Sequence, residues 1–146
     1  MNVELREITR DTVRAICKLD VADDQRGFVA PNAISIAEAH YEPKHWMRAI
    51  YVDGEPAGFV LTYEDPDGEG YHVWRFMVAQ GYQGRGVGRR AMQLLLERWH
   101  DLGATEASLS VIPGNGGAIG LYESLGFRLT GDEEHGELVM RMELAP

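Results

Sequence analysis

The sequence predicts one α/β domain in which a single mixed sheet carries helices on both of its faces. The chain has 146 residues, enough for one hydrophobic core and too few for two. Strand-like and helix-like patterns alternate along it in the order strand, helix, helix, three strands, helix, strand, helix, two strands. No linker, internal repeat or low-complexity stretch separates them, so we expect residues 1–146 to form one domain.

The first half of the chain combines two helices with a three-stranded antiparallel meander. Thr9 and the polar residues after it are typical of a helix start, Asn32 can cap a second helix, and Pro43 stops that helix. An Asp-Gly turn between two apolar runs is a strong hairpin signal. These patterns predict a strand over residues 3–8, helices over residues 9–19 and 33–41, an irregular stretch over residues 20–31, and strands over residues 48–52, 57–63 and 71–79.

The second half contains one long amphipathic helix. Its apolar residues recur at helical spacing from Val87 to Leu102, and Gly103 ends it. The remaining patterns predict a strand over residues 107–112, a short helix over residues 118–125, and two last strands over residues 127–131 and 137–144.

Composition limits the classes of partner. The formal net charge of −9 argues against nucleic acid, which requires a basic surface. The same charge would attract a cationic substrate, and it equally serves solubility. No apolar run approaches the roughly 20 residues that span a bilayer. The N-terminus lacks a signal-peptide pattern, so we expect a cytoplasmic protein that makes no membrane contact.

Cys17 is the single cysteine, so no internal disulfide can form. It shares a helical stripe with Val13 and Ile16. We therefore interpret Cys17 as a core residue and not as a nucleophile. We also expect no metal.

The segment that indicates chemistry is a glycine-rich turn between a strand and the long helix. Four glycines fall within residues 81–88, which exceeds the needs of a simple tight turn. Glycine lets main-chain N–H groups converge on one point, and the helix that follows adds its free N–H groups and positive dipole end. Together they would make an anion site suited to a diphosphate, with Arg85, Arg89 and Arg90 adding charge at its rim.

Two other meanings of such a turn do not fit. A nucleotide P-loop ends in Gly-Lys-Ser/Thr, whereas this chain has Gly88-Arg89-Arg90. The dinucleotide fingerprint would require glycine at Arg89, and it normally follows a first strand, whereas this turn follows the fourth.

Two motifs resemble those of one superfamily. The run Arg75-Phe76-Met77-Val78, followed by Gln83-x-x-Gly86-x-Gly88, resembles the acetyl-CoA-binding motif of GNAT acetyltransferases. Residues 115–127, with Asn115, Tyr122 and Gly126-Phe127, resemble the cofactor-flanking helix of that superfamily. The resemblance implies a central, mostly antiparallel sheet of about seven strands, whose fourth and fifth strands splay apart. Members are often dimers, so we expect a homodimer, with residues 127–144 as strands that could pair across it.

The resemblance also implies roles for individual residues toward acetyl-CoA. Main-chain groups around Met77 and Val78 would bind the pantetheine arm, and Asn115 would bind the cofactor near the splayed strands. The pyrophosphate would be held by the glycine-rich turn, which comprises Gln83, Gly84, Arg85, Gly86, Val87 and Gly88, together with Arg89.

The expected reaction is direct attack of a neutral amine on the thioester, with the N–H of Val78 polarising the carbonyl. Tyr122 would protonate the departing thiolate, because a phenol can donate a proton within hydrogen-bond reach. The alternative for Tyr122 is a core aromatic. The amine must also lose a proton, and some relatives use a glutamate where this chain has Trp74. His72 lies two residues earlier on the same face and is our candidate base, with a water relay or a structural histidine as the alternative.

The acceptor is predicted from a further resemblance. Residues 21–32 and the context of Trp74 are similar to bacterial spermine/spermidine N-acetyltransferases. Carboxylates of Asp23 and Asp24 could hold ammonium groups. Aromatic side chains could hold the methylene stems and support cations. The predicted acceptor residues are Asp23, Asp24, Phe28, Asn32, Trp46 and Trp74, although a solvated loop and ordinary core aromatics would explain them equally well.

Three functions therefore compete. The first is an N-acetyltransferase for a small amine, with a polyamine favoured. The second is a protein N-terminal or lysine acetyltransferase, and the third is a non-catalytic acyl-CoA sensor. Asn115 and Tyr122 together favour catalysis over sensing.

Overall fold

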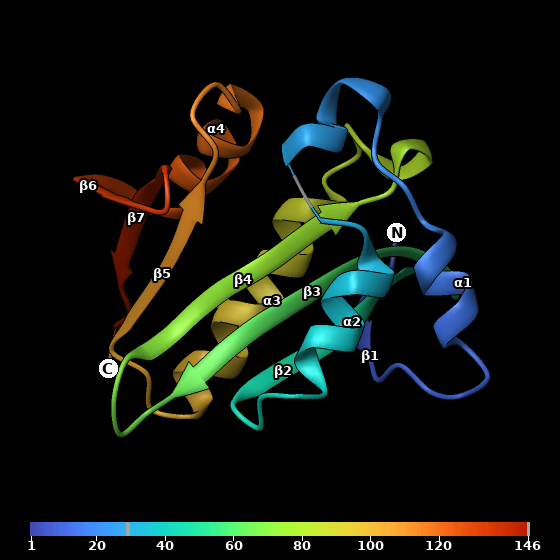
Figure 1. Ribbon diagram of the computed structural model, residues 1–146, viewed down its shortest axis with the longest axis horizontal. Coiled ribbons are helices and arrows are strands. Elements are labelled where there is room, and N and C mark those ends of the chain that lie inside the picture. Colours follow the sequence, from blue (N-terminus) through green and yellow to red (C-terminus); the bar gives the residue numbers. More distant parts are fainter. Residues whose placement is uncertain (29, 146) are drawn as a thin grey trace.

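The structure, a computed structural model, describes residues 1–28 and 30–145. Val29, which belongs to the acceptor-side motif, lies outside the described residues, as does Pro146. A seven-stranded sheet runs through the described part in the order β1-β2-β3-β4-β5-β7-β6 (Figure 1). The strands are β1 (Val3–Arg6), β2 (His45–Val52), β3 (Glu55–Asp65), β4 (Gly70–Val78), β5 (Glu106–Val111), β6 (Arg128–Glu134) and β7 (Glu137–Glu143). The helices are α1 (Val13–Lys18), α2 (Asn32–Ala39), α3 (Val87–Asp101) and α4 (Gly116–Leu125), with short 3-10 helices η1 (Asp23–Phe28) and η2 (Gln80–Tyr82).

The strand pairing confirms the predicted sheet. All neighbouring strands are antiparallel except β4 and β5, which are parallel. The order of strands and helices is also the predicted one, because each long apolar pattern has one clear period. The stretch predicted to be irregular contains η1, whose six residues include no buried side chain.

Two predicted helix caps are wrong. The first helix begins at Val13, and its N-cap is Thr12 instead of Thr9. Thr9 lies one turn earlier, where its carbonyl accepts hydrogen bonds from the N–H groups of Thr12 and Val13. In the second helix Pro31 occupies the N-cap and Asn32 is the first helical residue. The Asn32 side chain is buried and donates to the carbonyl of Ile16 at 2.9 Å, which joins α1 to α2.

The helices cover both faces of the sheet. Ile16 of α1 and Ile36 of α2 pack on one face against a cluster that includes Phe59, Leu61 and Met77. Trp99 of α3 and Tyr122 of α4 belong to the larger cluster on the other face. Figure 1 shows α1 and α2 in front of the sheet and α3 behind it. Among the described residues no helix is long and apolar enough to cross a bilayer.

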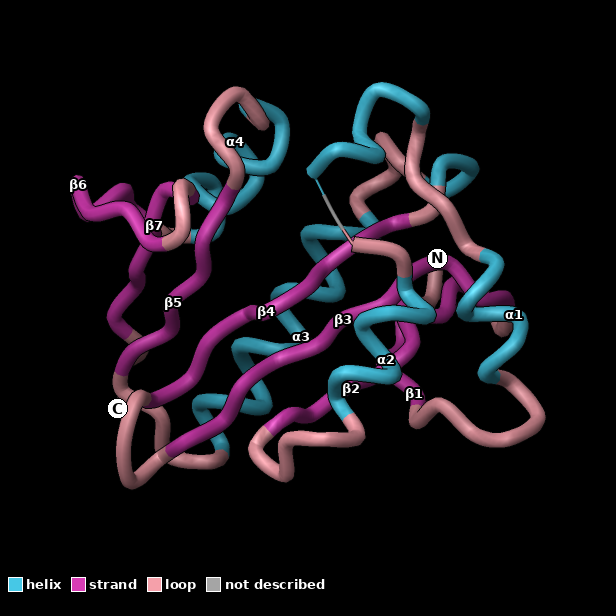
Figure 2. The backbone as a smooth tube through the Cα atoms, in the orientation of Figure 1, coloured by secondary structure: helices cyan, strands magenta, loops and turns pink. Residues whose placement is uncertain are grey.

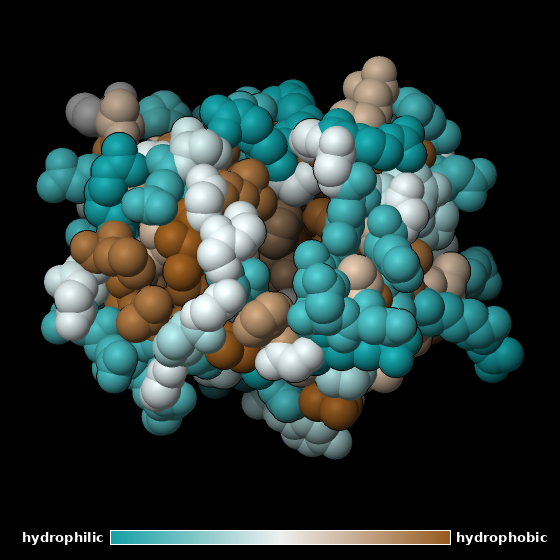
Figure 3. Space-filling view, turned by 90° about the horizontal axis from the view of Figure 1, so that it is seen from above, coloured by the Kyte–Doolittle hydropathy of each residue, from teal (hydrophilic) through white to brown (hydrophobic). Residues whose placement is uncertain are grey.

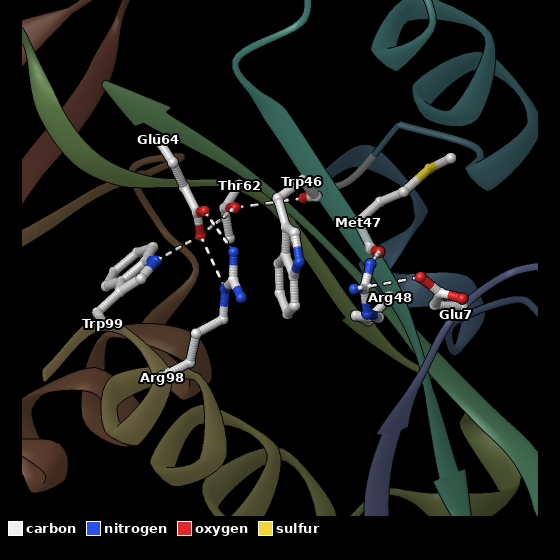
Figure 4. Close-up of polar contacts among 8 residues, drawn as sticks. All are labelled: Glu7, Trp46, Met47, Arg48, Thr62, Glu64, Arg98 and Trp99. Atoms are coloured by element: carbon white, nitrogen blue, oxygen red, sulfur yellow. Dashed lines mark hydrogen bonds and ion pairs between the residues drawn. The ribbon is translucent and has the colours of Figure 1, made fainter. Parts of the chain in front are cut away.

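A polar cluster fixes α3 against the sheet (Figure 4). Glu64 of β3 accepts hydrogen bonds from the guanidinium of Arg98, at 2.7 and 3.2 Å, and from the Trp99 indole at 2.7 Å. The guanidinium of Arg98 also stacks on Trp46 of β2, 4.0 Å from the ring centroid. Because Trp99 is fully buried, Glu64 gives its indole N–H the partner that burial requires. The cluster therefore anchors α3, whose other end reaches the site.

The parallel pair β4 and β5 separates along its length. Pairing begins at Tyr71 with Ala107 and ends at Val73 with Leu109, and Figure 2 shows the strands diverging beyond that point. On its other edge β4 has a bulge, because Leu61 pairs with Arg75 and Thr62 with Val73, which leaves Trp74 without a partner. Beyond Val73, no strand in the described part of the chain pairs with the main-chain groups of β4 that face β5. This confirms the predicted splay.

Candidate active site

The splayed strands open into a cleft. Its volume is about 740 Å³, in the range of small-molecule sites. The view from above shows this hollow between the two halves of the molecule, with apolar side chains inside it (Figure 3). The lining comes from β4 between Val73 and Val78, from β5 and its loop between Leu109 and Ile112, from the turn and first residues of α3, and from α4. It is completed by Glu137 of β7 and by residues of the first loop, namely Val21, Gln25, Gly27, Phe28 and Ala30. The fold therefore opens a cleft between β4 and β5, beside the N-terminus of α3.

The glycine-rich turn forms one end of the cleft. Gly84 and Gly86 have φ of +74° and +80°, a conformation that L side chains rarely adopt. Gly86 is the N-cap of α3, and its carbonyl receives the first helical bond from Arg90. The N–H groups of the first turn, from Val87 onward, thus have no partner within the helix. They lie beside the cleft with the positive end of the helix dipole, which suits an anion.

Most predicted cofactor residues come together in this cleft. The lining contains Met77, Val78, Gln83, Gly84, Gly86, Val87, Gly88, Arg89, Asn115 and Tyr122. Arg85 is the exception, because its guanidinium turns back over the ring of Tyr82, 5.5 Å from the centroid. Asn115 also caps α4 by accepting from the Ala118 N–H at 3.4 Å. Arg89 donates to the hydroxyl of Ser124 at 2.6 Å, which links α3 to α4 at the cleft.

Tyr122 lies on α4 with its side chain among the cleft-lining groups. Its ring packs edge-on against Phe76 and Phe127, with centroids 6.5 and 6.0 Å apart, and only 7% of the residue is exposed. Burial raises the pKa of the phenol above its usual value, because the anion would lose its hydration. The hydroxyl therefore stays protonated at neutral pH, which is the form that a proton donor requires.

His72 lies below the point where β4 and β5 separate, outside the cleft lining. Its Nε2 is 2.6 Å from the carbonyl oxygen of Glu69, and its Nδ1 is hydrogen-bonded to the hydroxyl of Ser108. A carbonyl only accepts, so in the neutral ring Nε2 carries the proton and Nδ1 accepts from Ser108. Both nitrogens of the candidate base thus have protein partners.

The predicted acceptor residues are scattered. Phe28 and Trp74 line the cleft, and Trp74 is 44% exposed. Asp23 and Asp24 lie on the outer side of η1, exposed and outside the lining, and Asp23 pairs with Arg26 at 3.3 Å. Asn32 is buried between α1 and α2, as described above.

Trp46 lies on the α3 face of the sheet, away from the cleft. Its ring is held between the guanidinium groups of Arg98 and Arg48, at 4.0 and 4.5 Å (Figure 4). The structure therefore does not bring Trp46 to the acceptor side.

Several cleft residues were not predicted. They include Val21, Gln25 and Gly27 from the first loop, Arg75 and Phe76 of β4, the β5 residues, Gly117, Ala118 and Leu121 of α4, and Glu137 of β7. The β5 residues follow from the predicted splay, since both separated strands must face the opening. Gln25 carries no local signal for its position. Within residues 1–28 and 30–145, no three His, Cys, Asp or Glu side chains are grouped as a metal site.

Comparison with known proteins places this geometry in a family. The family model described as "Acetyltransferase (GNAT) family" matches residues 5–127. The chain is similar over 99% of its length, at 28% identity, to the whole of spermine/spermidine N(1)-acetyltransferase of Bacillus subtilis. In fold it is similar to the PaiA N-acetyltransferase of Thermoplasma acidophilum solved with coenzyme A, with TM-score 0.76, 14% identity, and 98% and 99% of the two chains covered. It is equally similar to the ribosomal-protein-S18-alanine N-acetyltransferase of Escherichia coli, with TM-score 0.76, 20% identity, and 99% and 96% covered.

The family match and the cleft at the splayed strands agree on the kind of enzyme. The chain belongs to the acetyltransferase (GNAT) family and is an acetyl-CoA-dependent N-acetyltransferase of that type.

Proposed function

We propose that this protein acetylates a primary amine of a small polycation such as spermine or spermidine. The observation that carries the choice of acceptor is the full-length similarity to a spermine/spermidine N(1)-acetyltransferase. The formal net charge of −9 supports it, because a negative protein attracts polycations over long range. Phe28 and Trp74 offer apolar surface in the cleft for the methylene segments.

Several features of the cleft fit acetyl-CoA. Its splayed strands leave β4 main-chain groups free, its volume suits an extended ligand, and its glycine-lined end suits a diphosphate. In the proposed site the cofactor supplies an acetyl group activated as a thioester. Residues 83–88 hold the diphosphate with main-chain amides, and main-chain groups at Met77 and Val78 hold the arm between the strands. Asn115 contributes its side chain from the start of α4.

The proposed chemistry is a direct transfer in a ternary complex. The amine nitrogen forms a bond to the carbonyl carbon, the carbon–sulfur bond breaks, and the N–H of Val78 stabilises negative charge on the oxygen. Tyr122 gives its proton to the departing sulfur. A covalent acetyl-cysteine is not part of the proposal, because Cys17 packs against the α1 and α2 face of the core, outside the cleft lining.

His72 is the side chain that we propose as the base for the amine proton. To act, it has to release the Ser108 hydroxyl, which occupies the lone pair of Nδ1. A His72→Gln variant tests this role. We expect the lower apparent pKa in the pH profile of kcat/KM to disappear. A profile identical to that of the parent protein would instead assign the proton to a water relay.

The proposal is tested with an amine panel in a thiol-release assay. The panel contains spermine, spermidine, an aminoglycoside, an amino acid and a peptide with a free N-terminus. We expect the highest kcat/KM with spermine or spermidine. Preference for the peptide would indicate a protein acetyltransferase, and binding of acetyl-CoA without thiol release for any amine would indicate a sensor.

The exposed carboxylates Asp23 and Asp24 are proposed to raise polyamine affinity from the rim. Because both are solvated, we expect their joint replacement by Asn to raise the KM for spermidine only about twofold to fivefold. An unchanged KM would remove both residues from the acceptor site.

We also propose that the protein is a cytoplasmic homodimer. The strand β6 lies at the edge of the sheet and all seven of its residues are exposed, so its edge is available to a second copy. Light scattering after size exclusion tests the assembly, with twice the mass of the chain expected.

A further inference from the structure

One side-chain hydrogen bond joins the two walls of the cleft. Gln83 belongs to the glycine-rich turn, and Gln25 belongs to η1 on the acceptor side, 58 positions earlier. The side-chain Nε2 of Gln83 donates to Oε1 of Gln25 at 2.6 Å and to the carbonyl oxygen of Val78 at 2.8 Å. Both hydrogens of this amide are thereby used, so the end of β4, the turn and η1 are tied at one nitrogen.

This bond matters because little else fixes η1. None of its six residues is buried, and Arg26 forms ion pairs with Asp23 of η1 and with Asp20, three residues before η1. Beside it, Val21 packs in the core and the N–H of Gln80 donates to the carbonyl of Asp20 at 2.9 Å. Segments with few buried contacts open at low cost in free energy. Hydrogen bonds to residues 80–83 are therefore a main restraint on residues 20–28.

The segment held in this way forms the acceptor wall. Gln25, Gly27 and Phe28 line the cleft opposite β5. In Figure 1, η1 lies beside η2, which leads into the glycine-rich turn. The turn itself has two glycines at positive φ, so without a ligand it has more conformational freedom than other residues would allow. A diphosphate bound to its main-chain amides would restrict that freedom, and with it the position of Gln83.

We propose that Gln83 and Gln25 are positioning residues that couple the two substrates of the enzyme. Ordering of the turn by acetyl-CoA holds Gln83, Gln83 holds Gln25, and Gln25 holds the wall on which the amine binds. Coupling of this kind is reciprocal, so bound amine also strengthens the binding of coenzyme A. The inference rests on the proposed function, because it assumes acetyl-CoA and an amine as the ligands.

Three single variants isolate the bond. Gln25→Ala removes the acceptor oxygen, whereas Gln25→Glu keeps an acceptor at the same length and so preserves the bond from Gln83. Gln93→Ala, on the outer side of α3 and outside the cleft lining, is a matched glutamine control.

The first measurement needs no amine. Hydrogen exchange of residues 20–28 is followed with and without coenzyme A, alongside calorimetry of the same binding. We expect coenzyme A to slow exchange in the parent protein, in Gln25→Glu and in Gln93→Ala, but not in Gln25→Ala. The dissociation constant of Gln25→Ala for coenzyme A alone should stay within about twofold of the parent value, since Gln25 is not proposed to touch it.

The second measurement is steady-state kinetics with spermidine. We expect Gln25→Ala to raise the KM of the amine about threefold to tenfold, the effect of one net hydrogen bond, with kcat nearly unchanged. A purely structural role would also lower coenzyme A affinity, and Gln25→Glu would then not restore the KM.

The outcomes distinguish a failure of the proposed coupling from a failure of the proposed function. If coenzyme A binds but exchange at residues 20–28 responds equally in Gln25→Ala and the parent protein, the coupling is refuted and the proposed function stands. If the parent protein does not bind coenzyme A, both are refuted.

Discussion

Replacing Tyr122 by phenylalanine separates the catalytic role of this residue from its role in the core. The change removes one oxygen and keeps the ring contacts with Phe76 and Phe127. Burial is the cause of the raised pKa of the phenol, and the replacement leaves an apolar group in an apolar surrounding. The free energy of unfolding should therefore change by less than about 1 kcal/mol.

The effect on turnover should be far larger. A positioned general acid contributes roughly 10²–10⁴-fold, so we expect kcat to fall about 100-fold or more, which corresponds to about 2.7 kcal/mol of barrier. The KM for acetyl-CoA should change less than twofold. Because the pKa of the phenol is raised, Tyr122 stays protonated through neutral pH, and it should not set an alkaline limb of the profile near neutrality.

A thiol-reactive chromogenic assay measures this turnover, and urea unfolding measures stability. Tyr71→Phe is the matched control, since Tyr71 is 9% exposed on β4, packs against Trp99 and lies outside the cleft lining. Its kcat should equal that of the parent protein. A folded Tyr122→Phe enzyme that keeps more than a third of the parent kcat would refute the assignment.

Three further predictions concern the turn, the anchor of α3 and the response to pH. Gly86→Ala and Gly54→Ala each put a side chain at positive φ, so both variants should lose about 1 kcal/mol of the free energy of unfolding in urea. Only Gly86→Ala should weaken acetyl-CoA binding in calorimetry, by about tenfold. Equal affinities of the two variants for acetyl-CoA would contradict the diphosphate site. Glu64→Gln removes the ion pair with Arg98, so the free energy of unfolding should fall by about 2 kcal/mol. In thermal unfolding this corresponds to a melting temperature about 4–8 °C lower. An unchanged melting temperature would mean that this cluster does not anchor α3. Burial lowers the pKa of His45, whose Nδ1 has no hydrogen-bond partner among residues 1–28 and 30–145, so the fold favours the neutral ring. Its contribution to the free energy of unfolding should be fully present above the ordinary histidine pKa and decline as pH falls below it. Unfolding at pH 7 and pH 5 should show a smaller decline for His45→Gln, and an equal decline would assign the effect to other groups.

The parts of the fold that could be predicted depend on local patterns. The glycine-rich turn was predicted because positive φ at Gly84 and Gly86 is a local requirement that glycine meets. The helical spacing of apolar residues along α3 and the Asp-Gly turn of the hairpin are equally local signals. Accordingly most predicted cofactor residues line the cleft, since one short turn and one helix start supply them.

The acceptor side was harder to predict because it depends on which face of the sheet a residue occupies. His45 and Trp46 are neighbours on β2 and so point to opposite faces, and an apolar run does not indicate which face α3 covers. Trp46 consequently packs against Arg98 and does not reach the predicted acceptor side of the cleft. The hydrogen bond between Gln83 and Gln25 joins residues distant in sequence, and no composition or period indicates it.

Calorimetric titration of acetyl-CoA into the purified chain tests the central claim most directly. With main-chain amides of residues 83–88 holding the diphosphate, we predict saturable binding with a stoichiometry of one per chain and a dissociation constant well below 1 mM. A folded protein that gives no heat of binding at millimolar acetyl-CoA, at two temperatures, would contradict the account.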